Sequence, residues 1–581
     1  MRGRDTLKLP MLISTRLHAI TKAEVPAGSI LLGSWCRAYD AELQLPILPY
    51  HWENRDKLSD DYNEINKRYE EFLYRLAILL NKKHSVNYSL KYWRVLVGPW
   101  LLLYMQIMFD RWESVRIVAL SGEFFSNVHN DEILEFVALD TSHFTLLSHT
   151  DSWNHIVFRE IMKRFSSITL QTPMKFKNSI AKVNLEVVRG RRFRFIMHRL
   201  ISILSSVMTQ HWDKKLYVFQ APNLADAVRR NSVIKRGIIR LHDKIINPRI
   251  LSNNSLWTEF RNQALDWPVT GSFERFAMQM LPRFLPKIYL EDYAVFSSEA
   301  HRGLFPRQPS KILTSNSVYY SEMFKFWCAD KVDSGVPLYI YQHGGGYGAM
   351  KVCTNEDHEC AIADKFVSWG WSKLQSNVVP FGYCRSARIK LSKNRDNIVL
   401  VMTGLPRYSH KLASEPQSSN FERYLDDHIK LITGVKKSIR SKIVVRPPSL
   451  DYGWGIKERL SVIKDLASID DRSQNLSQLY SSAKVVIHTS NSTTFLETIN
   501  SDIPTLVLLN SQFYEIRDDA ESLFGALSNV GVLHYSVESL SLFLNNINSI
   551  DKWWNATATK IALNRFKSEF CKDCENEILE L

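Results

Sequence analysis

Short β-branched segments alternate with helical segments in the second half of the chain, and this alternation limits the fold more than any other feature. Helical stretches such as residues 423–440 separate many of these segments. Strands that alternate with helices build a parallel, doubly wound sheet with helices on both faces. We predict strands at residues 311–317, 337–342, 365–371, 397–404, 442–448, 483–490 and 504–510. The predicted fold class is therefore α/β.

The first half mixes its signals. A long helix is expected at residues 60–84, and a buried helix is expected to start at Pro99, where the missing N–H costs little. Strand-like segments occupy residues 116–120, 215–221 and 293–298.

A chain of 581 residues is too long for one ordinary core, so two domains are expected. A polar, proline-bearing segment at residues 299–311 indicates the connection between them. We therefore predict domains at residues 1–305 and 306–581, with the last helices able to pack back on the first domain.

The charge of the chain indicates its partners. A formal net charge of +14 and a pI near 9.2 favour anionic partners such as nucleotides, acidic glycans or an anionic membrane surface. The basic residues are spread along the chain without a long run of like charges, which argues against nucleic acid as a partner.

The most apolar stretch, residues 95–109, is interrupted by Gly98, Pro99 and Gln106, whereas a membrane span needs about 20 apolar residues. The basic N-terminus lacks the sustained apolar core of a secretion signal. The seven cysteines are odd in number and scattered, which suits free thiols in a reducing compartment. We expect a cytoplasmic protein whose contact with the inner face of the membrane, if any, is peripheral.

Ligands of parallel sheets bind at the carboxyl ends of the strands, so the residues after each predicted strand are the first candidates for a site. His343, Gly344, Gly345 and Gly346 follow the strand at 337–342. The glycines allow backbone N–H groups to approach a phosphate, and the imidazole can donate to it or act as a base. The alternative interpretation is a plain glycine turn.

Two further strand ends carry arginine. Arg446 closes the strand at 442–448, where its guanidinium could pair with phosphate or carboxylate in a bidentate manner. The alternative is a salt-bridged strand end. The strand at 397–404 brings Arg407 and His410 nearby, which is a weaker signal.

The strand at 483–490 leads into a helical segment through small polar residues, and this segment contains Glu497. Free N–H groups and hydroxyls at a helix start suit a nucleotide phosphate, and Glu497 could then reach a ribose. The structural alternative is a capping box between Thr494 and Glu497. We expect these residues to converge with His343 and Arg446 on one edge of the sheet. The small polar residues are Ser490, Asn491, Ser492, Thr493 and Thr494.

Tryptophan, arginine, histidine and acidic residues cluster in the N-terminal half. Aromatic faces stack on sugar rings and charged groups bind hydroxyls or carboxylates, so the clusters suit sugar recognition. A tryptophan-rich core with satisfied polar groups explains them equally. The candidates for binding a second substrate are Trp35, Arg37, His51 and Arg94, and those for a base or nucleophile are Asp110, Glu113, Asp151 and His343.

The order of these motifs resembles a bacterial family of surface-carbohydrate transferases, from about residue 11 to about residue 530. The family is similar in its second half to capsule and teichoic-acid type transferases of GT-B architecture. The resemblance implies two Rossmann-like domains facing each other across a cleft, with the C-terminal domain binding the nucleotide donor and the N-terminal domain binding the acceptor. The motifs are "LLGSWCRAYD", "LPYHWENRDKL", "YWRVLVGPW", "FDRWE", "YQHGGGYG", "SWGW", "DYGW" and "HTSNSTTFLET".

In that architecture a histidine-glycine strand end often contacts the phosphates or takes part in catalysis, and His343 is the match in this chain. One departure is Ser34, where relatives are expected to carry an acid before the tryptophan. If that acid is catalytic in relatives, this chain needs another base.

The resemblance implies transfer of a sugar from a nucleotide-activated donor to a cell-surface glycan or a lipid-linked glycan. CMP-activated ulosonic acids, such as Kdo or nonulosonic acids, are one donor class, and UDP-, GDP- or CDP-linked sugars are others. The chain lacks a convincing DxD strand end, so we expect no metal and no cofactor. Two alternatives are a non-catalytic glycan- or nucleotide-binding protein and a nucleotide-sugar epimerase of similar fold.

Overall fold

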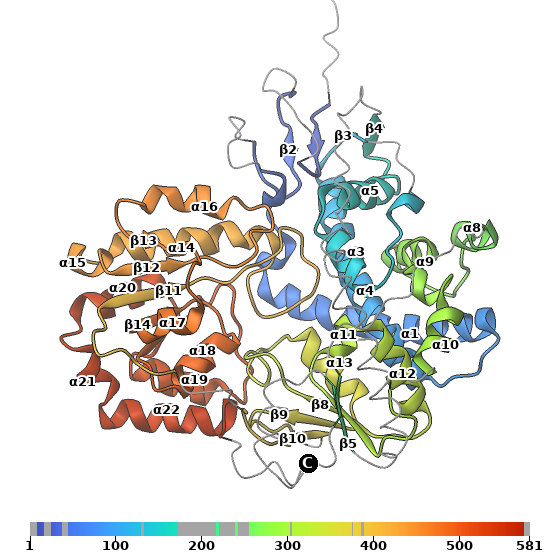
Figure 1. Ribbon diagram of the computed structural model, residues 1–581. Helices are drawn as coiled ribbons and strands as arrows, with labels where there is room; N and C mark the ends of the chain where they lie inside the picture. Colours follow the sequence, from blue (N-terminus) through green and yellow to red (C-terminus); the bar gives the residue numbers. More distant parts are fainter. Residues whose placement is uncertain are drawn as a thin grey trace, which may run out of the picture.

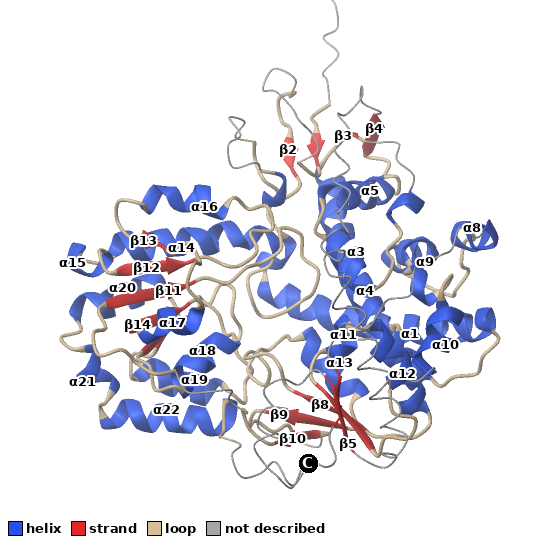
Figure 2. Cartoon of the chain, viewed as in Figure 1, coloured by secondary structure: helices blue, strands red, loops and turns tan. Residues whose placement is uncertain are grey.

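The computed structural model contains two six-stranded parallel sheets, each covered by helices (Figures 1 and 2). The second sheet and its helices, coloured orange to red, form the second lobe, and the rest of the described chain forms the first lobe (Figure 1). The structure describes residues 9–16, 25–37, 45–128, 133–171, 216–219, 239–241, 255–301, 305–374, 376–384 and 389–573. The predicted α/β class with two Rossmann-like units is confirmed by these two sheets.

The first sheet has the strand order β10-β9-β8-β7-β5-β6, and all neighbours pair in parallel. Its strands are short, and the side chains of β7 and β8 are mostly buried, as expected for a parallel sheet. The strands are β5 (Leu216–Phe219), β6 (Ile239–Leu241), β7 (Lys311–Thr314), β8 (Leu338–Tyr341), β9 (Lys365–Ser368) and β10 (Val378–Pro380).

The second sheet has the order β13-β12-β11-β14-β15-β16, again parallel throughout. The order reverses direction between β11 and β14, which creates a crevice at the carboxyl ends of these two strands. The strands are β11 (Asn397–Val401), β12 (Ile443–Arg446), β13 (Ser468–Ile469), β14 (Ala483–His488), β15 (Thr505–Leu508) and β16 (Leu533–His534).

Helices dominate the N-terminal half. Helix α3 is buried on nearly all sides because its sequence is apolar all round, and it starts beside Pro99 as predicted. The helices of the first lobe are α1 (Arg55–His84), α2 (Leu90–Leu96), α3 (Gly98–Ser121), α4 (Thr141–Ser148), α5 (Asp151–Met162), α8 (Ser255–Asn262), α9 (Ser272–Phe284), α10 (Tyr293–His301), α11 (Ser317–Tyr320), α12 (Glu322–Asp333) and α13 (Thr354–Ile362).

The helices of the second lobe are α14 (Phe421–Gly434), α15 (Lys437–Arg440), α16 (Ile456–Arg459), α17 (Leu476–Ser481), α18 (Thr493–Asn500), α19 (Glu521–Asn529), α20 (Val537–Asn546), α21 (Ile550–Trp554) and α22 (Thr557–Phe570). Short 3-10 helices lie at η2 (Ser34–Cys36), η3 (His51–Glu53), η4 (Ile133–Phe136), η7 (Lys287–Tyr289), η8 (Ser418–Asn420) and η9 (Leu460–Ile463). Two small parallel pairs, β1 (Leu12–Ile13) with β2 (Ile30–Leu31) and β3 (Phe124–Asn127) with β4 (Ile168–Gln171), complete the first lobe.

All strands predicted from residue 311 onward are present, and β5 lies within the predicted strand at 215–221. Two strand predictions were wrong: residues 116–120 form the last turns of α3, and residues 293–298 belong to α10. Both are short apolar runs, for which periodicity alone does not separate a strand from part of a helix.

The change from one sheet to the next falls between Pro380 and Asn397, and not near residue 306. Strands β7 to β10 pair with β5 in the first sheet, so the polar segment at 299–311 connects elements of a single lobe. Polar, proline-bearing composition marks a surface connection, and it does not by itself mark a domain boundary.

The residues after α22 return to the first lobe. The Lys572 N–H donates to the Trp369 carbonyl at 2.9 Å, and the Tyr383 N–H donates to the Lys572 carbonyl at 2.6 Å. Asp573 continues this contact as a parallel bridge partner of Tyr383. Backbone from the far end of the chain therefore pairs with the edge of the first sheet.

Cys384 is disulfide-bonded, so the expectation of free thiols throughout was wrong for this residue. Cys36, Cys328, Cys353, Cys360 and Cys571 form no disulfide. Across the part of the chain that the structure describes, no helix combines the length and apolarity needed to cross a membrane.

Candidate active site between the two sheets

The loop after β8 in the first sheet meets the start of α18 after β14 in the second sheet. A Cβ atom at Gly345 would lie 2.4 Å from the Ser492 carbonyl carbon and 2.5 Å from the Thr493 nitrogen. Real Cβ atoms do not approach backbone so closely, so only glycine fits at position 345. The predicted convergence on one sheet edge is corrected here, because His343 and residues 490–497 come from two sheets whose strand ends face each other.

His343 is held by a buried carboxylate. Its Nε2 atom lies 2.9 Å from Glu359 Oε1, and Glu359 is fully buried. The Tyr347 hydroxyl donates to the same oxygen at 2.8 Å and lies 3.1 Å from His343 Nε2. In the neutral ring, a carboxylate at Nε2 places the proton on that nitrogen, and the lone pair is then on Nδ1. The side chain is 22% exposed, so the imidazole can receive a proton from a bound molecule.

The glycine loop is anchored on both sides. Gln342 donates to the Gly344 carbonyl at 2.8 Å and accepts from the Trp371 indole at 2.8 Å. The Gly348 N–H donates to Glu356 at 2.6 Å, and Arg517 of the second lobe pairs with Glu356 at 3.2 Å. Burial raises the pKa of Glu356 to about 7 despite these two donors. The loop is thus fixed to both lobes.

Helix α18 begins with donors that its own cap does not use. Ser492 is the N-cap residue, and its side chain makes no capping hydrogen bond; its hydroxyl pairs with the Thr494 hydroxyl at 2.9 Å. The alternative interpretation, a capping box between Thr494 and Glu497, does not hold, because the N-cap residue is Ser492. The first N–H groups of a helix have no partner within it, and they carry the positive end of the helix dipole. The start of α18 is suited to an anion.

Asn491, one residue before the N-cap of α18, has a buried side-chain amide without a hydrogen-bond partner. It is 3% exposed, and neither its Oδ1 nor its Nδ2 atom has a hydrogen-bond partner. Leaving such a group unpaired costs about 1–3 kcal/mol, so a buried amide of this kind indicates a missing ligand or water. Glu497, one turn into α18, has no ion-pair partner within the described residues, and burial raises its pKa.

Arg446 is not free to bind a ligand in this state. It is 6% exposed, forms an ion pair with Asp470, and donates to the Gln474 carbonyl at 3.1 Å. The salt-bridged strand end is the interpretation that this geometry supports.

Asp151 joins the lobes at another point. Its carboxylate accepts from Arg407 at 2.6 Å and from the Tyr408 hydroxyl at 2.6 Å, both in the loop after β11. It is the first residue of α5, where a carboxylate also meets the helix dipole. Asp151 therefore connects the first lobe to the second.

Asp110 and Glu113 lie in buried charge networks. Asp110 accepts from the Tyr50 hydroxyl and from Arg111, each at 2.5 Å, and Arg111 is fully buried. For Glu113, burial raises the pKa, but pairing with Arg116 and with nearby Lys57 outweighs it and lowers the pKa to about 2. Both carboxylates are already committed to protein partners.

The four residues predicted to bind an acceptor are also engaged within the protein. Trp35 is 1% exposed, donates to the Ser14 carbonyl and stacks on Phe158, so neither face is open to a sugar. Arg37 pairs with Glu422 at 3.2 Å, Arg94 pairs in a bidentate manner with Glu70 at 2.5 Å, and His51 is 6% exposed. Burial lowers the pKa of His51 to about 4. Their role in acceptor binding stays a prediction, and burial argues against it.

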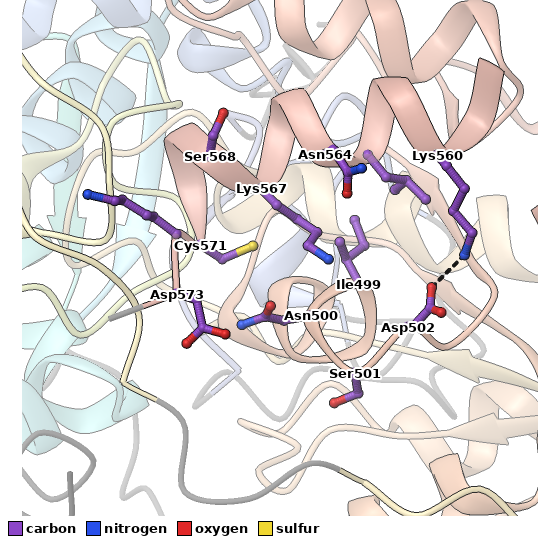
Figure 3. Close-up of a pocket in the computed structure, with 12 residues that line it drawn as sticks. Ile499, Asn500, Ser501, Asp502, Lys560, Asn564, Lys567, Ser568, Cys571 and Asp573 are labelled. Atoms are coloured by element: carbon purple, nitrogen blue, oxygen red, sulfur yellow. Dashed lines mark hydrogen bonds and ion pairs between the residues drawn. The ribbon is translucent and has the colours of Figure 1, made fainter. Parts of the chain in front are cut away.

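A pocket of about 530 Å³ lies at the opposite end of α18 (Figure 3). Asp502 follows α18 there and pairs with Lys560 at 2.7 Å, while Lys567 of α22 points into the space (Figure 3). Eight helical residues span about 12 Å, so this pocket is separate from the strand-end loops.

Sequence reasoning missed Glu359, Glu356 and Arg517, which hold the glycine loop. Glu356 and Glu359 lie in α13, and Arg517 follows β15, so only the tertiary fold brings them to position 343. No local motif in the sequence indicates these contacts.

The protein is therefore an α/β chain with two parallel sheets and a candidate site where the loops after β8 and β14 meet. The chain belongs to the LIC12162 family of transferases, whose family model matches residues 11–581. No curated protein matches the chain.

Solved structures with a related arrangement include an α,α-trehalose-phosphate synthase (UDP-forming) from Burkholderia vietnamiensis, with 11% identity and a TM-score of 0.35, covering 61% of this chain and 95% of that one. MurG from Acinetobacter baumannii has 11% identity and a TM-score of 0.30, covering 61% and 95%. The wall teichoic acid polymerase TagF has 10% identity and a TM-score of 0.30, covering 67% and 96%. Likenesses at these TM-scores carry no argument about function.

Proposed function

We propose that this transferase is a GT-B type glycosyltransferase, which moves a sugar from a nucleotide-activated donor to a cell-surface glycan acceptor. The observation that carries the proposal is the close approach of Gly345 to Ser492 and Thr493. It places a histidine with a free nitrogen and a helix start with free donors at one junction between two parallel sheets.

The donor phosphate binds at the start of α18 in this proposal. The first N–H groups of the helix, the Ser492 and Thr494 hydroxyls and the Asn491 amide supply hydrogen bonds, and the helix dipole favours the negative charge. Glu497 lies one turn further, where its carboxylate reaches a ribose hydroxyl. These groups stabilise the leaving phosphate, so we propose a metal-independent reaction.

His343 acts as the general base. Its Nδ1 atom takes the proton from the acceptor hydroxyl while the acceptor oxygen bonds to the anomeric carbon and the bond from that carbon to the donor phosphate breaks. Glu359 holds the imidazole and stabilises the imidazolium that forms. Asp110 and Glu113 take no part in this proton transfer, because each is already paired with buried or neighbouring cations.

The donor class in the proposal is a nucleotide sugar, with CMP-activated ulosonic acids ahead of UDP-, GDP- or CDP-linked sugars because the chain is basic. The acceptor is a glycan or a lipid-linked glycan on the cytoplasmic side. Basic surface can dock on the anionic membrane in a salt-dependent way.

Thermal unfolding with CMP, CDP, UDP and GDP tests the donor site, because a ligand that binds only the folded state stabilises it by about 2.7 kcal/mol at 100 times its Kd. We expect one nucleotide to raise the Tm of the wild type and Ser492→Ala to reduce that shift. Ser568→Ala removes an exposed hydroxyl from α22 and should leave the shift unchanged. If no nucleotide stabilises the wild type, the proposed donor site is wrong.

Product analysis then separates the alternatives. A transferase releases nucleotide from the matching nucleotide sugar and glycosylates the acceptor. An epimerase converts the donor without any acceptor, and a binding protein does neither.

A further inference from the structure

A loop of the second lobe, residues 405–418 after β11, is fastened to the first lobe on both sides of Lys411. The Leu412 N–H donates to Gln106 at 2.8 Å, and the Leu412 carbonyl accepts from the Thr354 hydroxyl at 2.6 Å. The Ser409 carbonyl accepts from buried Arg111 at 2.5 Å. Lys411 is therefore held at a fixed place where the lobes meet.

The Lys411 ammonium forms no ion pair with a described residue. It is partly exposed, beside a small cavity that His410, Glu415 and Gln417 also line. Its charge reaches both lobes: burial raises the pKa of Tyr452 and of Cys353, and Lys411 opposes both rises. A positioned cation without a counterion is available to an anion.

Three rings form a chain of contacts that begins at His410, the residue before Lys411. The His149 ring lies 5.0 Å from the His410 ring and 5.4 Å from the Tyr452 ring, edge to face in both cases. Burial lowers the pKa of His149 to about 4, so its imidazole is neutral at pH 7. Its Nε2 atom is buried and has no hydrogen-bond partner. A neutral imidazole can donate one N–H to an oxyanion, and a tyrosine ring can pack against a sugar.

These groups are connected to His343. The Tyr319 ring lies 6.4 Å from the His343 ring, and its hydroxyl donates to the Asn355 carbonyl at 3.4 Å. Asn355 follows Thr354, the residue that binds the Leu412 carbonyl next to Lys411. The cluster is therefore linked to the proposed base through Thr354, Asn355 and Tyr319.

We propose that Lys411, His149 and Tyr452 form a subsite for an oxyanion of the acceptor, either a carboxylate of an acidic sugar or a phosphate. This inference rests on the proposed glycosyltransferase function. In the proposed function the donor phosphate has its partners at α18, so a second anion-binding group linked to His343 selects the acceptor. Lys411 supplies charge, His149 supplies a directed donor, and Tyr452 contacts the sugar ring.

The test uses pairs of small probes that differ only in an anionic group: glucuronic acid against glucose, and glycerol 1-phosphate against glycerol. Saturation-transfer NMR measures their binding to the full chain in the presence of the nucleotide that stabilises it, so that the donor phosphate site is filled. We expect one anionic probe to bind at least tenfold more tightly than its neutral partner, and Lys411→Gln to abolish this preference while the nucleotide Kd is unchanged. The probe that shows the preference identifies carboxylate or phosphate.

Lys411→Arg keeps the charge and should keep the preference, and Lys430→Gln, on the exposed face of α14, is the matched control. Equal binding of charged and neutral probes to the wild type overturns the subsite, as does a preference that survives in Lys411→Gln. Failure of every nucleotide to stabilise the wild type overturns the proposed function instead, so the two failures are distinguishable.

Discussion

The charged and aromatic motifs of the N-terminal half and the plain strand-end loops make an instructive contrast. Trp35, Arg94 and Asp110 attract attention in the sequence, yet each is buried or bonded to another protein group. Asn491 and Ser492 are unremarkable residues, yet their polar groups are not used for capping or core bonding. A residue type shows what chemistry is available, and the partners decide whether that chemistry is free for a ligand.

The largest expected effect lies on the strand-end side of this contrast. His343→Ala should lower kcat by about 10²–10⁴-fold, because it removes the proposed base, while the nucleotide Kd changes little. Nucleotide release from the matching donor in the presence of acceptor measures the rate. Glu359→Gln keeps the shape of the positioning partner, and it should shift the pH profile of kcat rather than the nucleotide Kd. A His343→Ala enzyme with wild-type kcat would remove His343 from the mechanism.

On the core side, Asp110→Ala should destabilise the fold by about 3–5 kcal/mol, because it leaves Arg111 as an unpaired buried cation. Thermal and urea unfolding measure the loss. Asp396→Ala is the control, since Asp396 pairs with Lys442 at an exposed site and should cost less than about 1 kcal/mol. A stable Asp110→Ala variant without turnover would instead make Asp110 a catalytic group.

A single substitution can disrupt the contact between the glycine loop and the start of α18. Gly345→Ala should destabilise the chain by about 1–3 kcal/mol and remove the nucleotide-induced rise in Tm, because its Cβ collides with the Ser492 backbone. Gly525→Ala is the matched control: a Cβ there meets nothing within 4 Å, and the helix should gain about 0.5–1 kcal/mol. An unchanged nucleotide response in Gly345→Ala would show that the lobes need not approach at this point.

The smallest expected effect is that of Asn491→Leu, which should stabilise the free protein slightly and weaken its binding of nucleotide. Asn491→Leu removes two unsatisfied buried polar atoms, so the Tm of the free protein should stay the same or rise by the equivalent of about 1 kcal/mol. The same change should weaken nucleotide binding about tenfold, measured by titration calorimetry. Asn529→Leu, at an exposed position in α19, should leave the Kd unchanged. Unweakened binding in Asn491→Leu would assign the amide to a structural water.

Strand–helix alternation was sufficient to predict the four central strands of each sheet, because buried parallel strands are short, β-branched and apolar, but it did not predict the edge strands β6, β10, β13 and β16. The division of the chain was not predictable in the same way. Strand β7 pairs with β5 across a long sequence separation, and β8 pairs with β7, so both belong to the first sheet. Amino-acid composition does not show which strands pair.

The strand ends that form the candidate site could be predicted, but the residues that bond to their side chains could not. His343 and Ser492 were expected at one sheet edge; Gly345, two residues after His343, does meet Ser492, but the two loops belong to two sheets. The buried carboxylate of Glu359 and the ion pair that holds Arg446 depend on distances between elements, which a local motif does not contain.

The backbone pairing of Lys572 with Trp369 and Tyr383 has a consequence for how the protein is made. The first lobe leaves the ribosome long before residue 572 is synthesised, so its edge lacks these partners while the whole second lobe is being translated. Domains usually fold as units in the order of their synthesis. Here the first lobe acquires its last backbone partners only after the second lobe exists, so the two lobes reach their final state in one shared step.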